Sequence, residues 1–154
     1  MDPLQTITEA RIRQECGDRI FEKAFEYACS DSLRKRVVFP NTWQVRAELM
    51  GNYGNYVTIF QPLKNGLIYT FCSCPAEMEF CKHAAALGIT WIREPETFLS
   101  MDAVREMVQK KSKSELEEML MQALYRHLDC LALIGIEGFQ DEGDYDKEDE
   151  WDEE

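Results

Sequence analysis

Four side chains of the metal-ligating type fall within twelve residues near the middle of the chain, and no other feature constrains the fold as strongly. They are Cys72, Cys74, Cys81 and His83, in the pattern C-x-C, six residues, C-x-H. Three thiolates and one imidazole satisfy the tetrahedral coordination of zinc. Because four protein ligands leave no position for a catalytic water, the pattern predicts one structural Zn²⁺ ion.

The alternative interpretation is that these cysteines are reduced thiols, packed as small hydrophobic residues. That alternative accounts neither for His83 nor for the polar residues around the cluster. A cluster accompanied by isolated cysteines favours metal binding over a disulfide framework. The isolated cysteines, Cys16, Cys29 and Cys130, are expected to be buried small residues. His127 is expected to be a packed or boundary histidine, with a second metal ligand or a general base as the alternatives.

Hydrophobic periodicity and turn signals predict an α+β fold with a small antiparallel sheet. Helices are expected at 6–16, 19–29, 82–93, 103–110 and from 114 onward, and strands at 37–39, 43–50, 56–60 and 67–71. Asp18 is expected to cap the second helix, and Ser114 with Glu117 to form a capping box on the last. The sequence Lys64-Asn65-Gly66 suits a type I′ hairpin turn, and the returning strand runs directly into Cys72.

These elements suggest four segments: N-terminal helices over 1–36, strands and the metal site over 37–95, helices over 96–138, and a disordered acidic tail over 139–154. Residues 141–154 contain ten acidic residues and one lysine, so they contribute −9 of the net charge of −12. The tail could be a solubilising extension, or it could dock on a basic partner through its aromatic residues Tyr145 and Trp151.

The sequence around the cluster, C-S-C-P…C-K-H-A-A-A-L, resembles the SWIM-type zinc finger. Residues 43–51 and 56–59 resemble the strands that precede the finger in bacterial-type SWIM proteins, so the resemblance covers roughly residues 10–95. It implies a ββα zinc unit that contacts DNA or protein. Such modules occur beside SNF2-type ATPases and in transposases, signalling kinases and recombination accessory factors. This chain has neither a Walker-type phosphate loop nor a kinase motif set.

The resulting expectation is a non-catalytic zinc-binding interaction module that assists a DNA-processing partner, such as an SNF2-type ATPase or a recombination factor. The alternative is a protein that binds nucleic acid directly, through the finger face and two basic groups at 34–36 and 110–113. Solvated charge is the favoured interpretation of those two groups. The acidic tail argues against simple duplex binding, because its field repels phosphates.

No apolar run approaches the length of about 20 residues that a membrane span needs. Residues 1–14 lack the apolar stretch of a secretory signal, so a cytoplasmic protein is expected, or a nuclear one in a eukaryote. The residues expected to form an apolar wall around the metal are Phe71, Phe80, Leu87 and Trp91. Loss of one ligand is expected to unfold at least residues 65–95.

Overall fold

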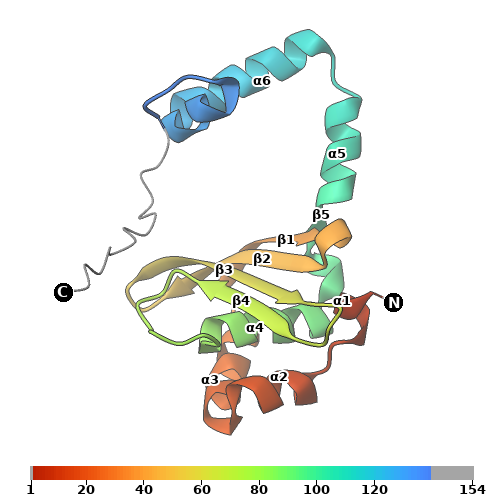
Figure 1. The fold of residues 1–154 in the computed structure, drawn as a ribbon, viewed down its shortest axis with the longest axis vertical. Helices are drawn as coiled ribbons and strands as arrows, with labels where there is room; N and C mark the ends of the chain where they lie inside the picture. The colour runs from red at the N-terminus through yellow and green to blue at the C-terminus, as the bar shows by residue number, and fades with distance from the viewer. Residues whose placement is uncertain (1, 140–154) are drawn as a thin grey trace, which may run out of the picture. The chain divides into compact units, whose positions relative to one another are not determined.

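A five-stranded sheet with helices on one face forms the main body of the chain in this computed structural model, which describes residues 2–139 (Figure 1). The strands are β1 (Leu33–Phe39), β2 (Gln44–Gly51), β3 (Gly54–Pro62), β4 (Ile68–Cys72) and β5 (Leu99–Ser100). They lie in the order β4-β3-β2-β1-β5. Strands β1 to β4 pair with one another in antiparallel fashion, whereas β5 runs parallel to β1. The predicted α+β class is therefore confirmed, with one short parallel strand that was not expected.

The hairpin between β3 and β4 lies where the sequence predicts it, but its turn differs from the type I′ turn expected. A type I′ turn requires positive φ at both central residues. Within this turn Gly66 has a positive φ, of 83°, but Asn65 does not. The Asn65 carboxamide instead accepts a hydrogen bond from the Leu67 amide at 3.0 Å. A loop of this kind needs one left-handed residue rather than two, and glycine supplies it at no steric cost.

The helices are α1 (Pro3–Thr6), α2 (Glu9–Cys16), α3 (Asp18–Ala28), α4 (Lys82–Arg93), α5 (Met101–Gln109) and α6 (Lys113–Arg126). Short 3-10 turns cover η1 (Pro40–Thr42), η2 (Pro95–Thr97) and η3 (Leu128–Ile134). Helix α4 packs against β2, β3 and β4, and α2 and α3 pack against α4. Among the described residues, no helix is both long enough and apolar enough to span a bilayer.

Three predicted helix starts are wrong, and for α2 and α6 a side-chain cap explains the difference. The helix expected at 6–16 is divided, because Thr8 is extended and its hydroxyl accepts a hydrogen bond from the Arg11 amide. Gly17, not Asp18, precedes α3, and the Asp18 carboxylate lies in the first turn of that helix. Helix α6 begins two residues earlier than expected, since Ser112 and Glu115 form the capping box.

The core lies between the sheet and α4, where every residue from His83 to Thr90 is buried. At Gly88 the helix backbone lies close to side chains of β3 and α2. A Cβ atom at that position would lie 2.7 Å from the Phe60 ring on β3 and 2.8 Å from Ile12 Cδ1 on α2. Real Cβ atoms do not come so close to other atoms, so the absence of a side chain at Gly88 allows α4 to pack against both.

The chain divides into two compact units, Met1–Met107 and Val108–Glu154, and the division falls within α5. The first unit contains the sheet and α1 to α4, so residues 1–36 and 37–95 share one core. In the second unit Leu124 of α6 is buried. The tail predicted to be disordered, residues 139–154, lies outside the described residues except for Phe139.

Candidate metal centre

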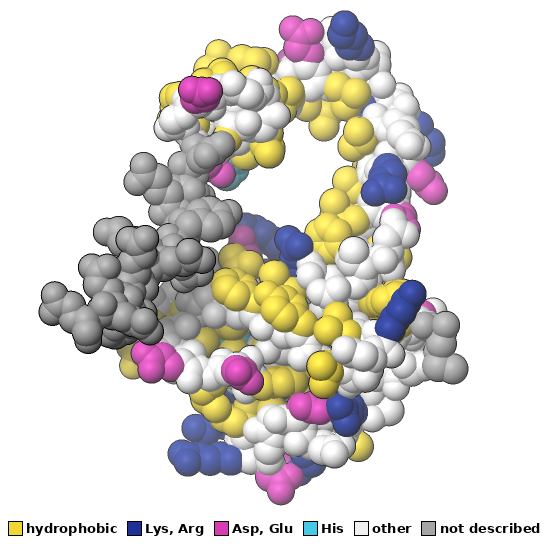
Figure 2. Space-filling model, viewed as in Figure 1, with side chains coloured by type: hydrophobic (Ala, Val, Ile, Leu, Met, Phe, Trp, Pro, Cys, Tyr) yellow, Lys and Arg dark blue, Asp and Glu magenta, His cyan; other side chains and the backbone are white. Residues whose placement is uncertain are grey.

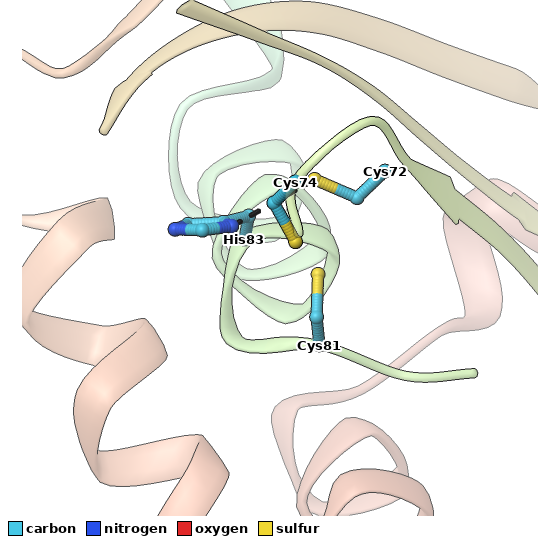
Figure 3. A group of neighbouring side chains, drawn as sticks. All are labelled: Cys72, Cys74, Cys81 and His83. Atoms are coloured by element: carbon cyan, nitrogen blue, oxygen red, sulfur yellow. Dashed lines mark hydrogen bonds between the residues drawn. The ribbon is translucent and has the colours of Figure 1, made fainter. Parts of the chain in front are cut away.

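Two neighbouring elements and the loop between them supply the four candidate ligands (Figure 3). Cys72 is the last residue of β4, and Cys74 follows two residues later in the loop. Cys81 is the N-cap of α4, and His83 lies in the first turn of that helix. The structure therefore brings together all four residues that the sequence predicts, on the strand end and helix start where they were expected.

The separations between the ligand atoms suit one metal ion. The three Sγ atoms and the imidazole nitrogen all lie within 4.8 Å of one another. The Cys72 Sγ atom is 3.7 Å from His83 Nδ1. Around a tetrahedral zinc with Zn–S bonds of about 2.3 Å, neighbouring sulfur atoms would be about 3.8 Å apart. The donor set, three sulfurs and one nitrogen, and its spacing both fit zinc with little rearrangement.

Hydrogen bonds from the surrounding backbone and side chains hold the sulfur atoms in place. The Ala84 amide donates to Cys81 Sγ at 3.4 Å, and Thr58 Oγ1 lies 3.5 Å from Cys72 Sγ. Between the first two cysteines, Ser73 faces β3: its hydroxyl accepts from the Val57 amide at 2.9 Å, and its own amide donates to the Val57 carbonyl at 3.0 Å. This pairing fixes the C-x-C turn, and interactions of this kind orient ligands around a metal.

Two of the candidate ligands, Cys72 and Cys81, influence each other's thiol pKa values. The hydrogen bond between Cys72 and Cys81 lowers the pKa of the Cys81 thiol and raises the pKa of the Cys72 thiol, because two sulfur atoms share one proton. The Ala84 amide lowers the pKa of Cys81 further by stabilising its thiolate. Zinc binds thiolates, so metal binding releases the shared proton and removes this coupling.

Two tyrosines pack against His83 and were not predicted as part of the site. The Tyr27 ring, at the end of α3, meets the imidazole edge to face with centroids 5.1 Å apart. The Tyr56 ring, on β3, lies at the same centroid distance with a 35° tilt. The alternation of β3 predicts an inward Tyr56, because Tyr56, Thr58 and Phe60 share one face. No sequence signal points to Tyr27, whose position depends on the packing of α3 on α4.

Two of the four residues predicted to form an apolar wall around the metal belong to or pack on the hydrophobic core. Leu87 is fully buried, and Phe80 packs on the core with its ring centroid 6.3 Å from that of Phe60. The prediction for Trp91 is wrong: this residue lies in the last turn of α4 against Phe98, at the opposite end of the helix from His83. The prediction for Phe71 is also wrong, because the alternation of side chains along β4 turns Phe71 to the exposed face of the sheet.

The other candidate residues do not form a second site in the described part of the chain, where the cluster above is the single group of metal-ligating residues found. His127 is exposed and ends α6, as a boundary histidine would. Cys29 is exposed, so the expectation that it is buried is wrong, while Cys16 and Cys130 are half-buried.

Comparison of the chain with protein-family models, with curated proteins and with solved structures finds no match. The resemblance to SWIM fingers therefore rests on the sequence motif. In the structure, the antiparallel pair β3 and β4 leads through the cysteine loop into α4.

Proposed function

We propose that the chain is a non-catalytic module that binds one structural zinc ion through Cys72, Cys74, Cys81 and His83 and docks on a protein partner. The observation that carries the proposal is the convergence of these four side chains at the junction of β4 and α4. Four protein ligands complete the coordination of zinc, so the ion supports the fold and leaves no open position for substrate.

The docking surface that we propose is the face of the sheet opposite α4, at the edge formed by β3 and β4. Figure 2 shows hydrophobic side chains gathered over these strands. Val57, Tyr69 and Phe71 on this face are 49%, 48% and 45% exposed. Ile59 lies among them, paired in register with Phe71. We call these four residues the open-face patch; grouped exposed apolar side chains mark interaction sites more often than isolated ones do.

A DNA-processing partner, such as an SNF2-type ATPase or a recombination factor, is proposed from the resemblance of the motif to SWIM fingers. Direct nucleic-acid binding is less well supported by the charges. Lys35 pairs with Glu48 at 2.7 Å, and Arg36 pairs with Glu94 at 2.8 Å. Lys111 lies 3.7 Å from Glu115. Acidic side chains thus partly neutralise both basic groups, in a chain of net charge −12.

The double variant Tyr69→Thr/Phe71→Thr tests the docking surface. Both side chains are exposed on β4, and threonine suits a strand, so we expect zinc content and the unfolding temperature to stay close to native values. Recovery of an ATPase or recombination factor from a nuclease-treated extract of the native cells should fall at least tenfold, measured by quantitative mass spectrometry.

The matched control is Leu67→Thr, an exposed apolar residue in the loop before β4, which should leave recovery unchanged. If the native chain instead recovers only nucleic acid, with binding that weakens steeply as salt is added, direct nucleic-acid binding replaces this proposal. Equal recovery by the native chain and the double variant would exclude the open-face patch as the docking surface.

A further inference from the structure

A pocket of about 290 Å³ opens beside His83. Its lining includes Tyr27, Asn52, Tyr53, Tyr56, Lys82 and His83, and we call it the tyrosine pocket. All of these residues belong to the first compact unit. As a metal ligand His83 would use one ring nitrogen, Nδ1, and the His83 side chain also lines the pocket.

The outer nitrogen of His83 is available to a ligand in this pocket. Nδ1 faces Cys72, and the other ring nitrogen points away from the three cysteines (Figure 3). His83 as a whole is 5% exposed, and no hydrogen bond joins its Nε2 to any of the described residues. Every fully buried side-chain nitrogen or oxygen among those residues has a hydrogen-bond partner, so Nε2 is not fully buried and a ligand can reach it. A metal-bound histidine usually donates its second N–H to a carboxylate, a carbonyl or water. An acceptor in the pocket would complete this arrangement.

The polar groups of the pocket suit one singly charged anion. No Asp or Glu lines the pocket, and the Cys74 thiol, which also lines it, is one of the metal ligands. Lys82 supplies a cation at the rim, with its Nζ 5.2 Å from the centroid of the Tyr27 ring. The Asn52 amide and the tyrosine hydroxyls add neutral donors. One cation with neutral donors matches a singly charged carboxylate better than a doubly charged phosphate ester.

The size and the aromatic walls suggest what carries the carboxylate. A volume of about 290 Å³ is at the lower limit of small-molecule pockets, so it suits one or two side chains better than a large cofactor. Tyr53, in the turn before β3, is 88% exposed, so its ring is free to close on a planar group. Aromatic rings attract each other in stacked or edge-to-face pairs.

We propose that the tyrosine pocket binds a carboxylate carried next to an aromatic ring on a partner polypeptide. This inference rests on the proposed function, because Nε2 is the free donor only when Nδ1 binds the metal. The carboxylate could belong to an Asp or Glu side chain or to a chain terminus, which share the same chemistry.

The test is an amide NMR titration of the zinc-loaded full chain with four probes. N-acetyl-tyrosine carries a terminal carboxylate, acetyl-Tyr-Asp-amide carries a side-chain carboxylate, acetyl-Tyr-Asn-amide is the neutral match, and inorganic phosphate is the competing anion. We expect at least one carboxylate probe to bind with a Kd of about 1 mM, and about tenfold more tightly than the neutral probe. The shifted amides should be those of residues 52–56 and 82–83. The carboxylate probe that binds more tightly shows whether the pocket prefers a chain terminus or an Asp or Glu side chain.

Lys82→Gln should weaken the carboxylate probe about tenfold and remove its advantage over the neutral probe, and Tyr53→Ala should weaken both probes. Lys23→Gln, an exposed lysine on α3, is the matched control and should change neither. The proposal of a carboxylate site would be contradicted by equal binding of the Asp and Asn probes, by tighter binding of phosphate, or by no binding to zinc-loaded protein. None of these results would contradict the zinc module. A folded chain without zinc would overturn both.

Discussion

Cys81→Ser should abolish stoichiometric zinc binding and, with it, the cooperative thermal unfolding of the Met1–Met107 unit. Cys81 is the most buried of the three cysteines in the cluster, and its side chain caps α4. A serine hydroxyl is a poor zinc ligand at neutral pH. With three ligands remaining, the ion would be held far more weakly.

The expected loss of stability is large because the metal and the core share one helix. Structural zinc contributes about 10–16 kcal/mol of apparent binding free energy in finger peptides. The total stability of a domain is about 5–15 kcal/mol, so loss of the ion is enough to unfold it. Residues His83 to Thr90 of α4 are all buried against the sheet and neighbouring helices. Unfolding of residues 65–95 would therefore remove the centre of the core.

Circular dichroism during heating, with zinc measured on the same samples, provides the comparison. Cys29→Ser is the matched control, because Cys29 is exposed and outside the cluster, and this variant should keep both the ion and the native transition. Addition of a strong zinc chelator to the native chain should reproduce the effect of Cys81→Ser. A native transition in Cys81→Ser would show that the core folds without the site.

Gly88→Val should destabilise the first unit by about 3 kcal/mol, the upper part of the range for overpacked cores. A Cβ atom at Gly88 would already lie 2.7 Å from the Phe60 ring and 2.8 Å from Ile12 Cδ1, and valine adds two methyl groups. Both neighbours are fully buried, so neither can move without disturbing β3 or α2. A loss of this size corresponds to a fall in unfolding temperature of about 10–20 °C.

Denaturant unfolding of zinc-loaded Gly88→Val measures this loss directly. Gly88→Ala is the comparison variant. Alanine adds a smaller side chain than valine and gains about 1 kcal/mol in helix propensity over glycine, so it should be clearly less destabilising than valine. Retention of zinc by the alanine variant would separate the packing effect from the metal effect. Native stability in Gly88→Val would contradict the close approach of α4 to Phe60.

The spacing of the metal ligands made the site the most predictable part of the molecule. Four ligands in twelve residues leave few arrangements that can surround one ion, and the hairpin signal before Cys72 placed them between a strand and a helix. The strands were recognisable for a related reason. Val45, Ala47 and Leu49 alternate with polar residues, and each of the three is buried in the sheet.

One error in the predicted fold arose where two local interpretations fit the same residues, and the features that were missed depend on contacts between distant parts of the chain. Ser112 and Ser114 each have a glutamate three residues later, and the structure forms the capping box at Ser112. Strand β5 has two residues and pairs with β1 across about 60 residues of sequence, so no local pattern could predict it. The contact of Tyr27 with His83 also depends on tertiary packing, in this case of α3 on α4.

The measurement that tests the central claim most directly is the metal content of freshly purified, reduced, folded protein, determined by elemental mass spectrometry alongside Cys81→Ser. The structure places Cys72, Cys74, Cys81 and His83 within reach of a single ion. We predict one zinc per native chain and less than a tenth of that in the variant. A native chain that is folded and contains no zinc would contradict the account.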